Sequence, residues 1–209
     1  MKRVNWALGV GAVVLGVGIW AAQAAPKKAA PGDKKVTAAD IACPVMNEAV
    51  NFYVKTESPN GPVYFCCAMC IEKYEKNKAK YEKKVAEQRK RVAALPKVQV
   101  TCPISGDVVD GKSSTEHNGE MVQFCCPKCI DHFKKDPEKY RAKLAGSYTY
   151  QTTCPISDEP IDPKSTTTMS DGETVYFCCP KCAAKFKEEP AKYAKKLETQ
   201  GYHLDLEKK

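Results

Sequence analysis

The sequence contains one four-cysteine pattern three times. In each copy 22 or 23 residues separate the cysteine of a Cys-Pro pair from two adjacent cysteines, and a fourth cysteine stands three residues after the adjacent pair. The copies use all twelve cysteines of the 209-residue chain. Chance does not produce such a register, so the chain is built from three tandem repeats of one small unit. The positions are Cys43, Cys66, Cys67, Cys70; Cys102, Cys125, Cys126, Cys129; and Cys154, Cys178, Cys179, Cys182.

Each repeat is expected to form a β-hairpin followed by a helix. Turn residues flanked by short β-rich segments lie between the first cysteine and the adjacent pair. After the last cysteine an aromatic residue recurs at the fourth and eleventh positions, which lie two helical turns apart on one face. The sequence therefore predicts small α+β units. The turns are Pro59-Asn60-Gly61, Asn118-Gly119 and Asp171-Gly172, and the strand pairs are 51–55 with 63–65, 113–117 with 120–124, and 165–169 with 173–177.

The helices are expected to differ between repeats. Asp136-Pro137 and Glu189-Pro190 place a proline where a fresh helical turn begins, which predicts a break in the second and third repeats. The first repeat has Asn77-Lys78 at that place and no proline before Pro96. Its helix is therefore expected to run unbroken over 69–95.

The cysteines are expected to hold metal ions. A unit of about fifty residues buries too little surface to be stable alone, and such domains rely on metals or disulfides. The spacing from Cys67 to Cys70 is that of a zinc knuckle, and Cys66 with Cys70 is an alternative pair. The first cysteine of each repeat supplies the remote ligand. Cys70, Cys129 and Cys182 each open a helix, whose N-terminal partial charge is expected to lower their thiol pKa.

Disulfides are the alternative use of the cysteines. Four thiols per repeat would give six bridges in the chain, and an oxidising compartment favours such bridges. The adjacent cysteines fit this arrangement poorly, because both bridges of a repeat would leave one point of the chain. The adjacent pair therefore favours metal and leaves disulfides open.

A family resemblance points the same way. A first cysteine, a gap of 22 or 23 residues, Tyr-Phe-Cys-x-x-x-Cys, an aromatic four residues on and a closing Pro-x-x-Tyr resemble the YHS/TRASH family of metal-binding domains. The most specific stretches run from Phe133 to Tyr140 and from Phe186 to Tyr193. The resemblance covers most of the chain after residue 24. It implies a treble-clef-like hairpin and helix that binds zinc or copper in heavy-metal trafficking, sensing or resistance, with no catalytic residue.

The chain departs from this family at two places. Many YHS domains carry Asp-Pro-Val-Cys, whereas here the family's cysteine position holds Met46, Ser105 or Ser157. The second cysteine of each adjacent pair is additional to the three-cysteine TRASH pattern. Each repeat is thus expected to hold about one ion, in either a closed four-thiolate zinc centre or an open three-thiolate centre suited to Cu(I). Met46 and Met69 offer thioethers in the first repeat, but they do not recur, which favours an ordinary packing or surface role.

The N-terminal stretch predicts export. Lys2 and Arg3 precede an uncharged apolar run over 6–22, and Ala22-Gln23-Ala24 supplies the small residues that a signal peptidase recognises. Residues 1–24 are thus expected to be a signal peptide, which places the rest of the chain in the periplasm or outside the cell. The alternative is an uncleaved membrane anchor, since 17 apolar residues lie at the lower limit for a spanning helix.

The positive charge does not predict nucleic-acid binding. The formal net charge is +8, and the segment 71–97 holds ten Lys and Arg against four Glu. Export would remove nucleic acid as a partner, and the aromatic residues do not interleave with the charges as a stacking platform requires. The segment is expected to be a solvated basic helix.

Together these features predict an exported protein for heavy-metal handling, storage or trafficking that is not an enzyme. Its expected partners are zinc or Cu(I) and a metal transporter or other exported protein. A stapled scaffold for protein contacts is the alternative, and a thiol oxidoreductase is the best enzymatic one. The repeats are expected to fold nearly independently. The predicted order is signal peptide 1–24, flexible linker 25–40, repeat 1 with a long basic helix at 41–95, repeat 2 at 98–146 and repeat 3 at 150–199.

Overall fold

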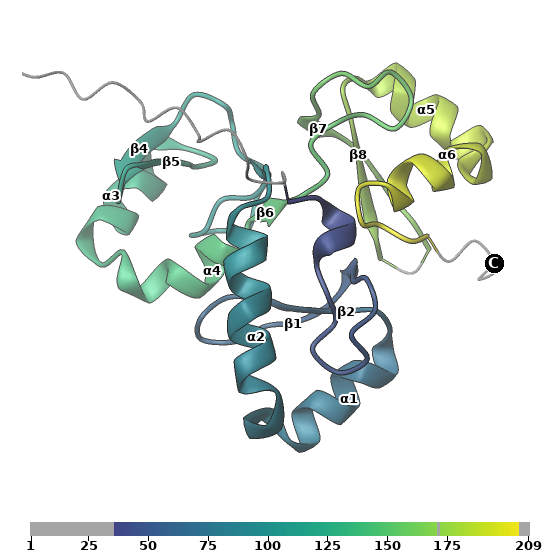
Figure 1. The fold of residues 1–209 in the computed structure, drawn as a ribbon. Helices are drawn as coiled ribbons and strands as arrows, with labels where there is room; N and C mark the ends of the chain where they lie inside the picture. Colours follow the sequence, from purple (N-terminus) through teal and green to yellow (C-terminus); the bar gives the residue numbers. More distant parts are fainter. Residues whose placement is uncertain (1–35, 171, 205–209) are drawn as a thin grey trace, which may run out of the picture. The chain divides into compact units, whose positions relative to one another are not determined.

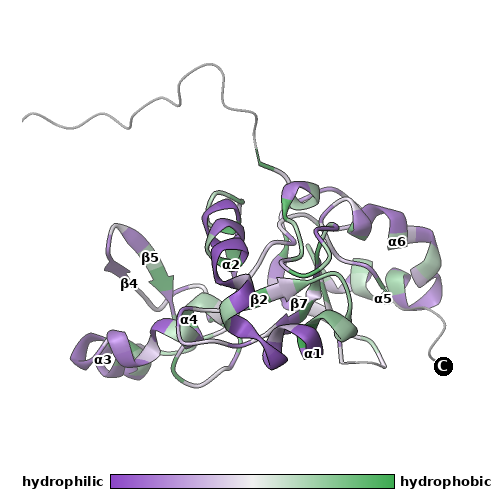
Figure 2. Cartoon of the chain, turned by 60° about the horizontal axis from the view of Figure 1, so that its bottom comes forward, coloured by the Kyte–Doolittle hydropathy of each residue, from purple (hydrophilic) through white to green (hydrophobic). Residues whose placement is uncertain are grey.

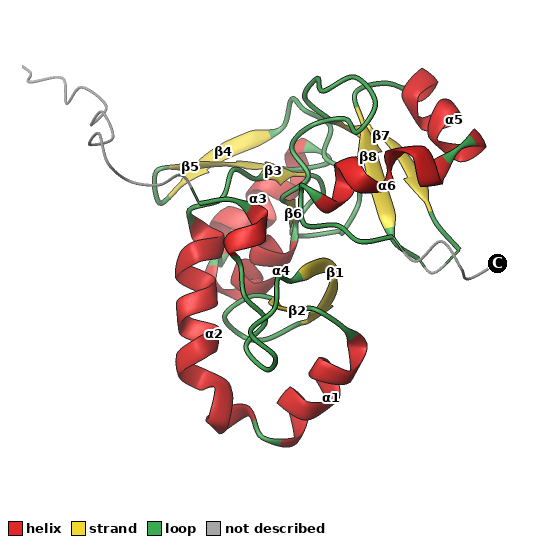
Figure 3. Cartoon of the chain, turned by 45° about the vertical axis from the view of Figure 1, so that its right-hand side comes forward, coloured by secondary structure: helices red, strands yellow, loops and turns green. Residues whose placement is uncertain are grey.

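The computed structural model of the chain describes residues 36–170 and 172–204 (Figure 1). The expected signal peptide, most of the expected linker and Asp171 lie outside the described residues. No described helix is both long and apolar enough to cross a membrane. Each repeat is a short antiparallel hairpin followed by helical segments (Figure 3), which confirms the small α+β class.

A hairpin followed by two α-helices recurs in the three repeats. Repeat 1 contains η1 (Ala38–Asp40), β1 (Asn51–Thr56), β2 (Val63–Phe65), α1 (Ala68–Lys76) and α2 (Lys78–Ala93). Repeat 2 contains β3 (Val98–Gln99), β4 (Ser114–His117), β5 (Glu120–Gln123), α3 (Pro127–Lys135), η2 (Glu138–Tyr140) and α4 (Arg141–Gly146). Repeat 3 contains β6 (Tyr148–Thr149), β7 (Asp162–Thr168), β8 (Thr174–Phe177), α5 (Pro180–Glu188) and α6 (Pro190–Glu198).

The hairpins form where the turn sequences predict them. Asn118 and Gly119 join β4 to β5 with φ of 52° and 80°, the left-handed conformation that Asn and Gly tolerate best. β1 pairs with β2 and β7 with β8 in the same antiparallel sense, each with one register shift. β3 pairs with β6, so the chain enters and leaves repeat 2 on adjacent strands.

The predicted aromatic face of the helix is present in each repeat. The Phe before the adjacent cysteines packs on the first helix aromatic, with ring centroids 5.2 to 5.4 Å apart. The second helix aromatic lies 6.2 to 6.4 Å from the first. These contacts fix the helix on the hairpin beside the cysteines. The rings are Phe65, Tyr74 and Tyr81; Phe124, Phe133 and Tyr140; and Phe177, Phe186 and Tyr193.

The helix of repeat 1 is broken, so the prediction of an unbroken helix over 69–95 is wrong. Asn77 separates α1 from α2 at φ −153° and ψ 69°. Its side chain accepts a hydrogen bond from the Lys80 N–H at 3.2 Å, which is N-cap chemistry that needs no proline. The breaks predicted at Asp136-Pro137 and Glu189-Pro190 are confirmed.

The basic helix is solvated as predicted. Along α2 the hydrophilic colour predominates in Figure 2. Only three of its residues are buried: Val85, Gln88 and Val92. Spacings of three and four residues place these side chains on one face, and the Lys residues of the helix remain exposed.

Repeats 1 and 3 share one hydrophobic core, whereas repeat 2 has a smaller core of its own. The Phe52 ring of β1 lies 4.6 Å from that of Tyr150 and 5.6 Å from that of Tyr202, centroid to centroid. The Phe52 N–H donates to the Gly201 carbonyl at 2.9 Å. Independent folding stays a prediction for repeat 2, whereas repeats 1 and 3 bury part of their cores against each other. The core of repeat 2 comprises Cys102, Val122, Phe124, Cys129 and Phe133.

Candidate metal centres

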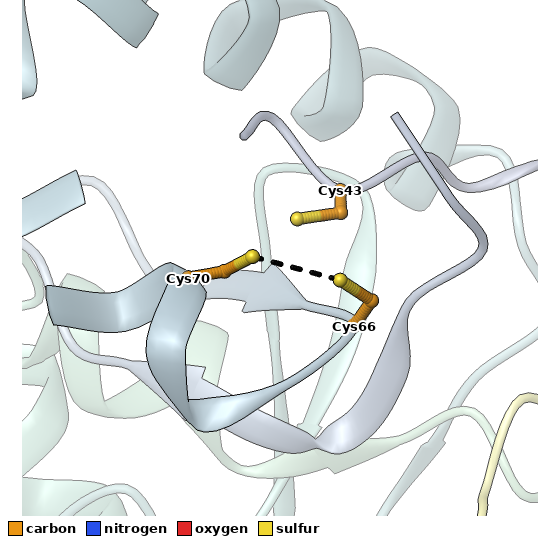
Figure 4. Close-up of side chains that lie close together, drawn as sticks. All are labelled: Cys43, Cys66 and Cys70. Atoms are coloured by element: carbon orange, nitrogen blue, oxygen red, sulfur yellow. Dashed lines mark hydrogen bonds between the residues drawn. The ribbon is translucent and has the colours of Figure 1, made fainter. Parts of the chain in front are cut away.

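Three cysteines from separate parts of each repeat gather at one point. In repeat 1, Cys43 lies on the loop before the hairpin, Cys66 follows β2, and Cys70 lies in the first turn of α1. Their Sγ atoms lie within 4.8 Å of one another, and those of Cys66 and Cys70 are 3.6 Å apart (Figure 4). We call these groups the thiol triads. The others are Cys102, Cys125, Cys129 and Cys154, Cys178, Cys182.

The loop that carries the first cysteine has the same backbone in all three repeats. The cysteine N–H donates to the carbonyl five residues on at 2.7 Å, and its own carbonyl accepts from the N–H four residues on. That fourth residue has a positive φ, with 64° at Asn47, 84° at Gly106 and 64° at Asp158. Asn, Gly and Asp are the residues that enter this region most readily, so the sequence encodes the loop three times.

The second cysteine of each adjacent pair ends the extended segment and begins the helix. Cys67, Cys126 and Cys179 are N-cap residues with φ between −164° and −156°. The Sγ atoms of Cys67 and Cys126 lie 3.7 Å from the last cysteine of their repeats, but all three N-cap cysteines stand outside the triads. The structure thus places nine of the twelve expected ligands in the triads. We call the other three, Cys67, Cys126 and Cys179, the rim cysteines.

The triads fit a thiophilic metal ion. Zinc binds cysteine sulfur at about 2.3 Å, so two sulfurs lie about 3.8 Å apart in a tetrahedral centre and about 4.0 Å apart in a trigonal one. The second and last cysteines of the triads have Sγ atoms 3.6 or 3.7 Å apart, close to both values. Thiolates select soft or borderline ions such as Cu(I) and zinc over Mg²⁺ and Ca²⁺. Each repeat is positioned to hold one ion.

The first cysteine of each triad ionises most readily within it. Burial opposes the ionisation of Cys102, but N–H groups of its own loop and of Cys125 outweigh burial and lower its pKa to about 7. Burial also opposes ionisation of Cys154, and the Ser157 hydroxyl and backbone N–H groups lower that pKa to about 7. The pKa of Cys43 is lowered in the same way by N–H groups, against the effect of burial. These donors stabilise a thiolate before any metal arrives.

The last cysteine of each triad behaves differently from the expectation. Burial raises the pKa of Cys70 to about 11, against a lowering effect of the Cys66 thiol. Burial and the neighbouring thiols raise the pKa of Cys182 to about 12 and also raise that of Cys129. The expectation that these helix-opening thiols have lowered pKa values is therefore wrong. The N–H groups of the first helical turn lower the pKa of the N-cap cysteines instead, as the Cys70 N–H does for Cys67.

A serine hydroxyl reaches two of the triads. The Oγ of Ser105 lies 3.2 Å from the Sγ of Cys125, and the Oγ of Ser157 lies 3.1 Å from the Sγ of Cys178. Both serines stand three residues after the first cysteine of their repeat. The position is occupied by Met46 in repeat 1. Repeats 2 and 3 thus share a polar neighbour that repeat 1 lacks.

A buried glutamine amide joins the first-cysteine loop to the hairpin in every repeat. In repeat 2, Gln99 accepts a hydrogen bond from the Gln123 N–H at 2.8 Å and donates to the Gln123 carbonyl at 2.7 Å. It also donates to the Thr101 carbonyl at 3.1 Å. Thr101 precedes the first cysteine and Gln123 lies two residues before Cys125, so this amide sets the separation of two ligands.

Sequence reasoning found the cysteines and missed their polar supports. A glutamine three residues before the first cysteine was visible in repeats 2 and 3, at Gln99 and Gln151. The corresponding residue of repeat 1 is Asp40, and there the amide comes from Gln88 of α2. The glutamine therefore does not recur at one sequence position, although an equivalent amide is present in all three repeats of the structure.

Comparison with known proteins identifies no relative. No protein-family model, no curated protein and no solved structure matches the chain. The three repeats nevertheless match one another in loop, hairpin, N-cap and triad, so each repeat serves as a comparison for the other two.

Proposed function

We propose that this is an exported metal-binding protein that holds one zinc or Cu(I) ion in each repeat, for heavy-metal storage, handling or trafficking. The observation that carries the proposal is the thiol triad, which recurs three times with its Sγ atoms within 4.8 Å. Three different chain segments converge on each triad, and N–H groups stabilise a thiolate within it. Thiolates prepared in this way suit a soft metal ion.

The position of the rim cysteines supports a site that can take up and release its ion. Cys67 lies 3.7 Å from Cys70 and 3.9 Å from Cys66, measured between Sγ atoms, while remaining outside the triad. A small side-chain movement would bring it to an ion held by the triad. Three thiolates then suit Cu(I), and a fourth closes a tetrahedral zinc centre. This arrangement is consistent with the resemblance to YHS/TRASH domains, and the apolar N-terminal run over 6–22 supports export.

The stoichiometry of bound metal tests the proposal. The full chain, reduced and titrated with zinc or with Cu(I) under anaerobic conditions, is expected to bind three ions in native mass spectrometry. Replacing Cys43, Cys102 and Cys154 singly by Ser is expected to remove one ion each. A chain purified from its own compartment with six disulfides and no metal would overturn the proposal.

A structural scaffold is the second candidate, because each triad joins a loop, a hairpin and a helix. The first and last cysteines of a triad are also buried, as at Cys43 and Cys70. The two functions differ in the fate of the metal. A site for delivery gives up its ion to a competing chelator while the chain stays folded, whereas a structural ion leaves only with unfolding. Circular dichroism recorded during chelator titration distinguishes them.

A further inference from the structure

The residue three positions after the first cysteine has the same backbone placement in every repeat. On either side of it, the cysteine N–H bonds to the carbonyl five residues on at 2.7 Å, and the next residue has a φ of 64° to 84°. A side chain at this position therefore leaves the chain at the same place relative to the triad. In repeats 2 and 3 that side chain brings a hydroxyl to within 3.1 or 3.2 Å of a triad sulfur.

Repeat 1 places a methionine at this position. Met46 is 50% exposed and does not belong to the hydrophobic core, whereas the preceding Val45 packs against it. Met69, directly before Cys70, is 66% exposed, and repeats 2 and 3 have Lys128 and Lys181 there. Repeat 1 thus has a solvent-exposed thioether where repeats 2 and 3 have the hydroxyl, and a second one directly before Cys70, and burial does not account for either.

We propose that repeat 1 is the Cu(I)-preferring site of the chain and that Met46 determines this preference by offering its thioether to the ion held by Cys43, Cys66 and Cys70. This inference rests on the proposed function and assigns Cu(I) to repeat 1. A thioether is a neutral, soft donor that favours Cu(I), whereas a hydroxyl offers no such preference.

The sequence alone favoured an ordinary packing or surface role for Met46, because methionine does not recur at this position. The shared loop geometry reverses that reading. In repeats 2 and 3 the side chain at this position reaches a triad sulfur, at Ser105 and Ser157. The lack of recurrence then marks a difference in metal preference between repeats.

Metal competition on the full chain tests the preference. Met46→Ser is expected to weaken the tightest Cu(I) site by at least about tenfold, read by competition with a chromophoric Cu(I) chelator, and to leave zinc affinity within about twofold. Met121→Ser is the matched control, because Met121 is 57% exposed on β5 and lies outside the triads. The reverse change, Ser105→Met, is expected to create a second tight Cu(I) site in repeat 2.

Methionine-methyl NMR adds a residue-resolved readout. With ¹³C-methyl methionine, the Met46 signal is expected to shift at the first equivalent of Cu(I) and to stay in place with zinc. Unchanged Cu(I) affinity in Met46→Ser, or an equal loss for both metals, would overturn the assignment to Met46. A wild-type chain that binds neither metal would instead refute the proposed function, so the two failures are distinguishable.

Discussion

Gln88 and Gln151 make the same three hydrogen bonds from different elements of the chain. Gln151 stands three residues before Cys154, whereas Gln88 lies on α2, well after the last cysteine of its repeat. Gln88 accepts from the Tyr64 N–H at 3.1 Å and donates to the Tyr64 carbonyl at 2.8 Å, as Gln151 does with Tyr176 at 2.9 and 2.7 Å. Each also donates to the carbonyl before the first cysteine. The second helix of repeat 1 thus supplies the amide that joins the loop before Cys43 to the strand before Cys66.

Removing the Gln88 amide is expected to destabilise repeat 1 and its metal site together. Gln88→Ala leaves the buried Tyr64 N–H without its acceptor, which costs about 1–3 kcal/mol in the free energy of unfolding. The loop before Cys43 and the strand before Cys66 lose their common tie, so the affinity of that site falls by about 10- to 100-fold. Urea unfolding and metal competition measure the two effects.

Glu87→Ala is the matched control for this prediction. Glu87 is the neighbouring residue on α2, with an exposed side chain that pairs with Arg91 at 3.2 Å. Exposed pairs of this kind contribute about 0–1 kcal/mol, so this variant stays near wild type. Equal effects of the two substitutions would show that the Gln88 amide does not support the triad.

The sequence predicted the parts of this fold that depend on local pattern. Hairpin turns such as Asn118-Gly119 and the helix aromatics follow from short-range rules, and the cysteine spacing identified the four-thiol groups that contain the triads. It could not separate Cys66 from Cys67 as ligands, because that depends on where the strand ends and the helix begins. The break at Asn77 was missed because an Asn N-cap is a weaker signal than a proline. Gln88 was missed because only tertiary packing brings it to the triad.

The two adjacent cysteines of repeat 1 are expected to contribute unequally. Cys66 belongs to the triad and Cys67 lies at its rim, so Cys66→Ser is expected to reduce metal affinity far more than Cys67→Ser. Cys43→Ser and Cys70→Ser are expected to abolish tight binding in repeat 1, because each removes a buried ligand of the triad. Competition with a metal chelator measures the metal affinity of each variant, and the two unchanged repeats serve as the internal reference. A larger loss in Cys67→Ser than in Cys66→Ser would exchange the roles of the two thiols.

The metal-free, reduced chain is expected to ionise first at Cys102 and Cys154. Burial opposes ionisation, but hydrogen-bond donors outweigh it and lower each pKa to about 7 from the ordinary 9.0. Because the folded pKa lies below the unfolded one, this contribution to stability is fully present above pH 9 and is lost as the pH falls through 7. Thiolate absorbance at 240 nm is expected to rise near pH 7.

The variants Cys102→Ser and Cys154→Ser identify the source of this absorbance. Each is expected to lose part of the step near pH 7 and to keep the absorbance that develops at higher pH, since the pKa of Cys182 is about 12. An unchanged step in both variants would assign it to other thiols. Metal affinity of repeats 2 and 3 is expected to fall below pH 7, where protons compete for the first ligand.

Gly201→Ala is expected to destabilise the shared core of repeats 1 and 3. Gly201 has a φ of 82°, and a Cβ there would lie 2.7 Å from the Phe52 ring. The left-handed backbone alone costs about 1–2 kcal/mol for alanine, and the displacement of Phe52 adds to it. Gly172→Ala is the control, with a φ of 89° and open space around the Cβ. Urea unfolding measures the free energy of unfolding. An equal loss in the two variants would show that displacement of the Phe52 ring adds nothing to the cost of the left-handed backbone.

Lys78→Pro is expected to be tolerated, although Lys78 belongs to α2, the longest of the described helices. Lys78 is the first residue of α2, where the N–H has no intrahelical acceptor. The preceding Asn77, at φ −153° and ψ 69°, resembles Asp136 at −155° and 78°, which does precede a proline. The exposed Lys78–Glu75 ion pair is lost, while proline restricts the unfolded chain, so the free energy of unfolding should stay within about 1 kcal/mol of wild type. Lys83→Pro, inside α2, is expected to cost about 3 kcal/mol or more. Urea unfolding compares the two, and an equal loss would mean that the chain does not break at Asn77.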